Sequence, residues 1–250
     1  MKEEKIKIIF VHGWGMNSMV WQPLIDNLPD WIDAECIDLP GHGAASQQVF
    51  NSLDDLVAAL AEKVSQPVIW VGWSLGGLAV MQLALQYPEK VKAMLLVSSS
   101  PCFVHKADWL HAMDESVFDV FADELEKDFS GTIRRFLTLQ VRSSESGRQV
   151  LKSLREKVLA QPPANIEALR AGLNVLKIVD LRNQLKNIKQ PVSWVLGGRD
   201  TLIKSTLSTQ LKSITPTAKI KVFEQAAHAP FLSHQQQFSE QLISFVKEVL

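Results

Sequence analysis

The pentapeptide Gly-Trp-Ser-Leu-Gly at residues 72–76 stands between a short apolar run, residues 67–72, and a segment that is apolar all round, residues 75–86. The run is rich in β-branched and aromatic residues and is typical of a strand buried in a parallel sheet, whereas the segment after it is typical of a buried helix. A serine in such a strand-to-helix turn is held in a strained conformation that projects its hydroxyl, and the flanking glycines avoid clashes with neighbouring elements. The pentapeptide therefore predicts a parallel sheet and a nucleophile, Ser74.

Strand-like and helix-like segments alternate along most of the chain. The other strand-like runs cover residues 6–11, 34–39, 91–98, 192–196 and 218–223, and the other helix-like segments cover residues 52–64, 202–214 and 235–249. This alternation predicts an α/β fold, with a mostly parallel sheet of six strands flanked by helices. The chain has 250 residues, which is long enough to bury a substantial core.

The alternation stops between residues 101 and 185. Apolar residues recur there at helical spacing, as in Val117, Phe118, Phe121 and Leu125, and convincing strand-like runs are absent. An insertion of this length is far longer than the usual connection of about 2 to 6 residues in an α/β unit. We therefore expect an all-helical lid at residues 101–185, inserted into a core formed by residues 1–100 and 186–250.

A serine hydroxyl needs a base that removes its proton and an acid that orients the base, in the chain order Ser, Asp or Glu, His. His228 follows the run that ends at Phe223, and Asp200 follows the run at residues 192–196, so both lie at the carboxyl ends of predicted strands. An aspartate in this position is also typical of a helix cap, but the order with Ser74 and His228 favours a catalytic triad. The remaining histidines lie in turns, in the insertion or at the start of the last helix: His12, His42, His105, His111 and His234.

The tetrahedral intermediate of acyl transfer carries an oxyanion that needs hydrogen-bond donors. We expect one donor to be the backbone N–H of Leu75, the residue after the nucleophile, where the start of the helix also favours negative charge. The second donor is expected from the His-Gly-Trp-Gly turn after the first strand, at Trp14. An aromatic cover over the core is the alternative role for Trp14, and both roles are compatible.

Charge and cysteine content exclude several classes of protein. The 26 basic and 27 acidic residues give a net charge of -1, which argues against a dedicated nucleic-acid binder. No apolar stretch reaches the ~18 residues of a membrane span. Cys36 and Cys102 have no metal-ligand or redox spacing and suit buried positions in a protein of a reducing compartment. We expect a cytoplasmic monomer without metal or organic cofactor.

Several motifs together carry a resemblance that runs almost from end to end. They are VHGWG, DLPGHG, GWSLGG, SSSPCF, FLTLQ, KIVDLR and AAHAPF. The chain resembles α/β-hydrolases of the esterase branch, and within it the pimeloyl-acyl carrier protein methyl ester carboxylesterases of biotin synthesis. This resemblance implies a serine esterase that releases methanol from an ester carried on acyl carrier protein. Many α/β-hydrolases have two further strands before the first one here, so the resemblance implies a sheet truncated at that edge.

The resemblance also implies a set of substrate contacts: Trp14, Ser74, Leu75, Phe136, Leu137, Thr138, Leu139, Gln140 and His228. Ordinary packing in the core is the alternative for Phe136, Leu137 and Leu139, because an amphipathic helix must bury one face.

Acyl carrier proteins are acidic, and the insertion offers a basic segment that could bind one. Residues 108–128 hold eight acidic residues and one lysine, whereas residues 134–157 hold seven basic residues and two acidic ones. We expect carrier docking on Arg134, Arg135, Arg142, Arg148, Lys152 and Arg155. These bases could instead pair with the acidic residues of 108–128.

Three other functions fit the same triad. They are a broad-specificity short-chain carboxylesterase, a relative that acts in menaquinone synthesis, and a ligand-sensing α/β-hydrolase with slow turnover.

Overall fold

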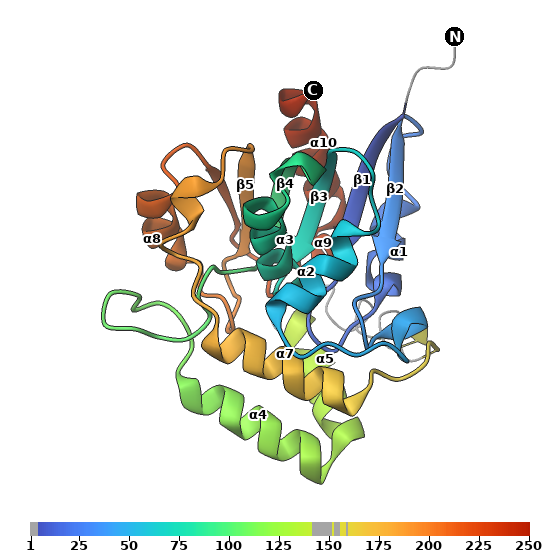
Figure 1. Cartoon of the computed structure of the whole chain (residues 1–250), viewed down its shortest axis with the longest axis vertical. Coiled ribbons are helices and arrows are strands. Elements are labelled where there is room, and N and C mark those ends of the chain that lie inside the picture. Colours follow the sequence, from blue (N-terminus) through green and yellow to red (C-terminus); the bar gives the residue numbers. More distant parts are fainter. Residues whose placement is uncertain (1–4, 142–151, 153–155, 159) are drawn as a thin grey trace.

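The core of the molecule is a parallel sheet of six strands (Figure 1). The structure is a computed structural model that describes all residues except 1–4, 142–151, 153–155 and 159. Its strands lie in the order β2-β1-β3-β4-β5-β6 and pair in parallel, which confirms the predicted fold class. Their bounds are β1 (Ile6–Val11), β2 (Ile32–Ile37), β3 (Val68–Trp73), β4 (Val91–Val97), β5 (Val192–Gly197) and β6 (Lys219–Phe223).

The two edges of the sheet differ from its centre in a way that the sequence pattern explains. Every residue of β3 is buried, as expected for a strand covered on both faces. The edge strands alternate instead, with Asp33 and Glu35 exposed on β2 and Lys219 and Lys221 exposed on β6. Charged side chains on edge strands discourage pairing with other chains.

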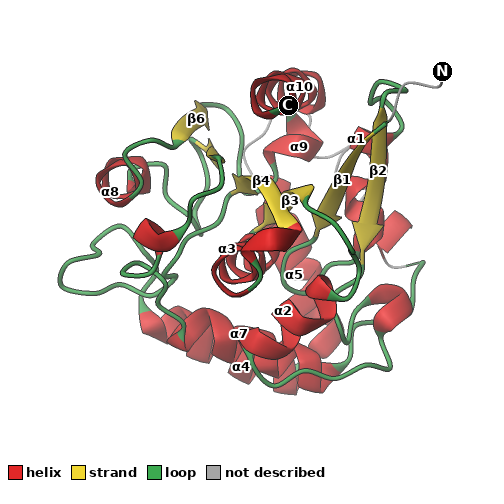
Figure 2. Cartoon of the chain, turned by 45° about the horizontal axis from the view of Figure 1, so that its top comes forward, coloured by secondary structure: helices red, strands yellow, loops and turns green. Residues whose placement is uncertain are grey.

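Helices cover both faces of the sheet. The helices α2 (Leu53–Ala61) and α3 (Leu75–Gln86) lie on one face, and α9 (Pro230–Ser233) and α10 (Gln235–Val249) lie on the other (Figure 2). The other core helices are α1 (Gln22–Ile25), α8 (Leu207–Ile214) and the 3-10 turns Ser18–Trp21, Gly43–Ala45, Pro88–Lys90 and Leu185–Asn187. No helix in the described ranges is both long and apolar enough to span a bilayer.

One predicted helix begins later than its apolar pattern indicates. We expected a helix from about residue 202, but α8 begins at Leu207. The carboxylate of Asp200 accepts hydrogen bonds from the backbone N–H groups of Leu202 (2.8 Å) and Ile203 (3.0 Å), which holds this stretch in a turn. The Asp200 side chain, three residues after the end of β5, therefore competes with helix formation at residues 202–203.

Three helices of 13 residues each lie across the carboxyl ends of the strands (Figure 1): α4 (Glu115–Lys127), α5 (Phe129–Val141) and α7 (Ile166–Ile178). Residues 101–114, before α4, form turns and isolated bridges such as Cys102 with Asp180 and Val104 with Met113. Helical structure in the expected lid thus begins at Glu115. We keep the division into a core, 1–100 and 186–250, and a lid, 101–185, as a proposal.

Both cysteines are free thiols. Cys102 is buried and Cys36 is half-buried. Burial raises the pKa of both thiols, that of Cys36 to about 12. Thiols with raised pKa values are poor nucleophiles near neutral pH, as expected for cysteines that only fill space.

Candidate active site

Ser74 stands at the sharp turn between β3 and α3. Its backbone has φ 53° and ψ -117°, a conformation that costs a residue other than glycine about 1–3 kcal/mol and persists only where the surroundings enforce it. One restraint is the hydrogen bond from the Ser74 N–H to the carbonyl of Val97 at the end of β4 (3.0 Å). The side chain is 5% exposed and faces a cavity under the three long helices.

Two glycines allow this turn to lie close to its neighbours. A Cβ on Gly76 would lie 2.5 Å from the carbonyl oxygen of His12, and one on Gly72 would lie 2.6 Å from the Cα of Gly77. Backbone atoms cannot yield to such contacts without moving the turn. The spacing of the glycines around Ser74 is therefore a packing requirement as well as a sequence signature.

His228 and Asp200 form a buried pair beside Ser74. The Nδ1 of His228 donates to Oδ2 of Asp200 at 2.7 Å, because a carboxylate only accepts. In the neutral tautomer that donates from Nδ1, the Nε2 of His228 is the acceptor; this atom is buried and has no hydrogen-bond partner among the described residues. The Ser74 hydroxyl makes no hydrogen bond with it here, and such bonds are often long in the absence of substrate. The other oxygen of Asp200 accepts from the N–H groups of Leu202 and Ile203, so it caps a turn before α8 and not the helix itself, which begins at Leu207.

Trp73, the residue before the nucleophile, also restrains the base. Its indole N–H donates to the backbone carbonyl of His228 at 2.8 Å, and the two rings lie 5.6 Å apart. One side chain on β3 thus fixes the histidine loop relative to the nucleophile. Sequence reasoning missed this role, and its only signal was the aromatic residue inside the pentapeptide.

The oxyanion donor expected at Trp14 is the N–H of a peptide whose carbonyl is hydrogen-bonded on the opposite side. The carbonyl of Gly13 in the same peptide accepts from Nδ1 of His12 (2.8 Å) and from the N–H of Met16 (3.3 Å). Because a trans peptide points its C=O and N–H in opposite directions, these bonds also direct the N–H of Trp14. His12 is neutral, since burial lowers its pKa, and its Nε2 accepts from the N–H of Leu39.

The Trp14 side chain joins the core to the lid helices. It is buried, its indole N–H donates to the carbonyl of Leu169 on α7 (2.8 Å), and it contacts Phe136 edge-on. The aromatic-cover alternative therefore holds beside the backbone position. Neither the N–H of Trp14 nor that of Leu75 has a hydrogen-bond partner in the described part of the chain. Both are available to an oxyanion.

A narrow apolar cavity of about 30 Å³ lies over Ser74 and His228. Most of its wall comes from α4, α5, α7 and the loop before α4. Besides the two catalytic candidates, its lining residues are Trp14, Phe103, Met113, Val117, Phe118, Phe121, Phe136, Leu173, Leu176 and Leu202. The cavity has room for about one water molecule, so a substrate must displace side chains to enter.

Comparison with known proteins identifies the family. A model described as alpha/beta hydrolase fold matches residues 7–235. The chain is 39% identical over 238 residues to the pimeloyl-acyl-carrier protein methyl ester esterase of Vibrio cholerae, covering 95% of this chain and 93% of that protein. It is 38% identical over 231 residues to the protein of the same name from Nitrosomonas europaea, covering 92% of each. The chain belongs to the α/β-hydrolase family.

Solved structures of other α/β-hydrolases share the fold. A bromoperoxidase from Bacillus anthracis superposes with a TM-score of 0.88 at 18% identity, covering 97% of this chain and 92% of that one. An esterase from Exiguobacterium antarcticum gives 0.87 at 18% identity, covering 98% and 92%. At this identity the likeness concerns the fold alone.

The structure places the substrate contacts expected on α5 in different surroundings. Phe136 lines the cavity, whereas Leu137 is fully buried but is not among the lining residues, which favours the packing alternative for it. The Thr138 hydroxyl donates to the carbonyl of Arg134, one turn earlier. The side chains of Leu139 and Gln140 lie outside the described part of the structure.

The basic residues expected to dock a carrier are also divided. Arg135 pairs with Glu124 (3.2 Å) and with Asp128 (3.7 Å), so the internal-pairing alternative holds for it. Arg134 is exposed and forms no ion pair with a described residue. Lys152 lies 4.0 Å from Glu156. Arg142, Arg148 and Arg155 lie outside the described residues.

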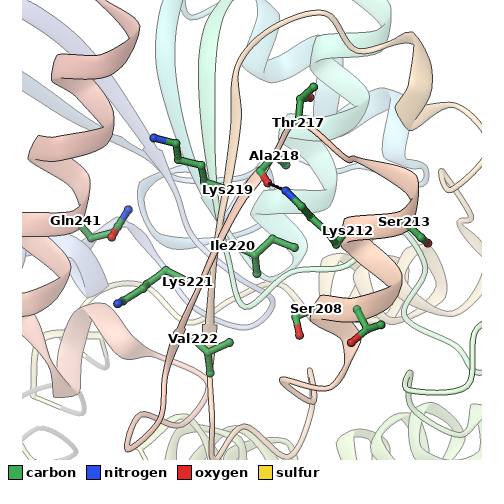
Figure 3. Close-up of a pocket in the computed structure, with 11 residues that line it drawn as sticks. Ser208, Lys212, Ser213, Thr217, Ala218, Lys219, Ile220, Lys221, Val222 and Gln241 are labelled. Atoms are coloured by element: carbon green, nitrogen blue, oxygen red, sulfur yellow. Dashed lines mark hydrogen bonds between the residues drawn. The ribbon is translucent and has the colours of Figure 1, made fainter.

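A larger hollow of the α/β-hydrolase lies away from the triad. This groove of about 1140 Å³ runs over β6 between α8 and α10 (Figure 3). Lys219, Lys221 and Gln241 lie on the α10 side, whereas Lys212 bonds to the carbonyl of Ala218 on the α8 side. No triad residue lines this groove, so the small cavity is the candidate active site.

Proposed function

We propose that this α/β-hydrolase is a serine carboxylesterase that hydrolyses the methyl ester of a pimeloyl group carried on acyl carrier protein. The products are the free pimeloyl carboxylate, still attached to its carrier, and methanol, in a step of biotin synthesis. The single observation that carries the proposal is the match with relatives of this name, at 38% and 39% identity over 92% and 95% of the chain. The geometry around Ser74 supplies the chemistry.

The first half of the reaction forms an acyl-enzyme. His228 Nε2 takes the proton of the Ser74 hydroxyl while Oγ bonds to the ester carbon, and the carbonyl electrons move to its oxygen. The N–H groups of Trp14 and Leu75 bind this oxyanion. The carbonyl then re-forms, the bond to the methoxy oxygen breaks, and methanol leaves with the proton from His228. Asp200 holds the imidazole and stabilises its charged form throughout.

The second half regenerates the enzyme. A water molecule gives its proton to His228 and attacks the acyl carbon, and a second oxyanion forms in the same site. Its collapse breaks the bond to Ser74 Oγ, which regains its proton from the histidine. All proton transfers pass through Nε2 of His228, an atom that has no hydrogen-bond partner among the residues that the structure describes.

The cavity supports an apolar chain as the substrate portion next to the ester. Its aromatic and aliphatic walls offer contact to methylene groups, while the Ser74 hydroxyl and the His228 imidazole are placed together at one part of the lining. A methyl ester is small and uncharged, so it fits this environment, whereas the carboxylate product does not. This difference favours release of the product.

Acyl carrier protein as partner, a cytoplasmic location and a monomeric state belong to the same proposal. Arg134 supports the docking part, because an exposed cation without an acidic partner is available to an acidic surface. It adjoins α5 residues that face the cavity, so a carrier bound there would hold its acyl chain near the site.

The test compares three esters with the purified protein. We expect kcat/KM for pimeloyl-acyl carrier protein methyl ester to exceed that for its free methyl ester and for p-nitrophenyl butyrate. Growth of a biotin-requiring strain that lacks the esterase should be restored by the chain but not by its Ser74→Ala variant. Equal kcat/KM values for all three esters, without growth, would instead identify a broad esterase. A single turnover followed by trapped product would identify a sensor.

A further inference from the structure

Three consecutive serines follow β4, and their hydroxyls have different partners although all three residues are fully buried. The Ser98 hydroxyl has no hydrogen-bond partner among the described residues. The Ser99 hydroxyl donates to the backbone carbonyl of Ser74 at 2.7 Å. The Ser100 hydroxyl donates to the carbonyl of Cys102 at 2.5 Å. Only the middle serine contacts the nucleophile's own peptide.

The carbonyl that Ser99 binds belongs to the peptide that supplies the second oxyanion donor. The C=O of Ser74 and the N–H of Leu75 lie in one planar trans unit and point in opposite directions, so a bond that fixes the C=O also directs the N–H. The same carbonyl accepts from the N–H groups of Gly77 (3.0 Å) and Leu78 (3.2 Å) in the first turn of α3. The hydroxyl makes the shortest of the three contacts.

The strained backbone of Ser74 gives this bond a role beside the helix hydrogen bonds. The ψ angle of Ser74, -117°, is far from the helical value, so the first turn of α3 and the Ser99 hydroxyl together hold the direction of this peptide. Gly77 provides the space for the restraint, because a Cβ there would lie 2.6 Å from both Cβ and Oγ of Ser99. The glycine and the serine thus form one local arrangement behind the elbow.

We propose that Ser99 is a positioning residue that directs the N–H of Leu75 toward the oxyanion. The inference rests on the proposed serine esterase mechanism. The other donor shows the same construction, with the Gly13 carbonyl held by His12 while the N–H of Trp14 stays free. Each donor peptide is fixed by a buried side chain on the side away from the substrate.

The three serines provide a matched experiment. Ser99→Ala removes the bond to the elbow, Ser100→Ala removes a buried hydrogen bond elsewhere, and Ser98→Ala removes a hydroxyl that bonds to nothing described. Hydrolysis of p-nitrophenyl butyrate is measured and divided by the active-site titre from a fluorophosphonate end-point, so that misfolded protein does not count. Loss of a whole oxyanion donor costs about 10²–10³ in kcat, so we expect about tenfold for a misdirected one. KM should stay within about twofold.

A second readout isolates the oxyanion. Ser74 Oγ adds to the carbonyl carbon of a trifluoromethyl ketone while the serine proton moves to His228. The former carbonyl oxygen then carries a negative charge and occupies the oxyanion site. Ser99→Ala should weaken the binding of this ketone by about the same factor as kcat, and should leave the matched methyl ketone, which forms little adduct, within about twofold. The two control variants should retain the wild-type ratio of the two ketones.

The outcomes separate this proposal from the proposed function. Absence of ester hydrolysis by the wild type would overturn the function itself. Hydrolysis by the wild type, with Ser99→Ala matching Ser100→Ala in kcat and in the ketone ratio, would overturn the role of Ser99 alone. If Ser99→Ala yields no titratable protein, Ser99→Cys fills the same space but replaces the hydroxyl by a much weaker donor, so its ketone ratio should also fall, and a wild-type ratio in that variant would contradict the proposal.

Discussion

Hydrogen bonds from buried side chains surround the catalytic region, whereas the helices that cover it combine apolar packing with ion pairs at their surface. Around Ser74, each catalytic candidate is at most 6% exposed, and hydrogen bonds from buried side chains such as Trp73 and His12 end on backbone carbonyls. The helices α4, α5 and α7 are joined by ion pairs of exposed side chains, among them Arg135 with Glu124 and Arg170 with Glu126. Exposed pairs contribute about 0–1 kcal/mol each and weaken in salt.

The difference matches the requirements of the two regions, since the catalytic groups must be fixed and the cavity above them must admit a substrate. Acyl transfer needs donors, base and nucleophile fixed to fractions of an ångström, and only a packed core provides that. A cavity of about 30 Å³ must widen for an acyl chain, so the apolar side chains of α4, α5 and α7 that line it must yield, and the exposed ion pairs between these helices add little resistance. The variants below test this contrast.

The largest effect is expected in the core. Ser74→Ala removes the only group that can form the acyl-enzyme, so kcat should fall by roughly 10³-fold or more while the fold is kept. Ester hydrolysis with a burst-phase measurement checks this expectation. Substantial turnover in the variant would exclude Ser74 as nucleophile.

Trp73→Phe tests whether the buried bonds of the core act on catalysis. The variant keeps an aromatic ring but loses the hydrogen bond to the carbonyl of His228. The imidazole of His228 should therefore be less precisely placed relative to Ser74, and kcat should fall by about tenfold. Trp70→Phe is the matched control, since this indole lies on the same strand, is equally buried and donates to the carbonyl of Lys90 away from the triad. Both variants should lose about 1–3 kcal/mol of unfolding free energy. Equal kcat values in the two variants would contradict a positioning role for Trp73.

The sequence predicted the sheet and the order of the triad because both depend on local signals. A buried strand can be recognised from about six consecutive apolar residues, and the turn around Ser74 requires glycines two residues before and two residues after the serine. The bonds that fix this site are different: Trp73 to His228 and Trp14 to Leu169 each join residues 155 positions apart. The spacing of apolar residues along the chain does not predict such long-range contacts.

Among the residues of α5, the sequence also could not predict which neighbouring side chain makes which contact. Phe136 and Leu137 are both apolar and adjacent, and the sequence could not say which one reaches the cavity. Arg134 and Arg135 are likewise adjacent and both basic, yet only Arg135 meets acids on the turn after α4 and on α4 itself. Helix faces were predictable, but their partners depend on how the helices cross.

A buried histidine should make the stability of the core sensitive to pH. Burial, aided by the nearby His12, lowers the pKa of His42 to about 3. The unfolded chain binds a proton there below about pH 6.5 and the folded chain does not, so stability is full above that pH and falls as the pH drops toward 3. Between pH 7 and 5 this histidine should cost about 2 kcal/mol of unfolding free energy.

His42→Phe keeps a ring against His12 and removes the titration. Urea unfolding at pH 7 and pH 5 measures the difference between the two conditions for each protein. We expect the drop to be about 2 kcal/mol smaller in the variant than in the wild type. An identical drop in both proteins would mean that His42 is charged in the folded state.

The smallest effect is expected at the lid surface, where neighbouring arginines offer an internal comparison. Arg134 is exposed without a described acidic partner, whereas the charge of Arg135 is already met by Glu124 and Asp128. Arg134→Gln should therefore raise KM for the carrier-linked ester by about threefold at low salt, and Arg135→Gln by less. Neither variant should change KM for p-nitrophenyl butyrate. The difference between the two variants should shrink in 0.5 M salt, because the Debye length there is only about 4 Å and exposed charges are screened. If both variants raise KM equally for both esters, the lid acts through its packing over the cavity and not through its charge.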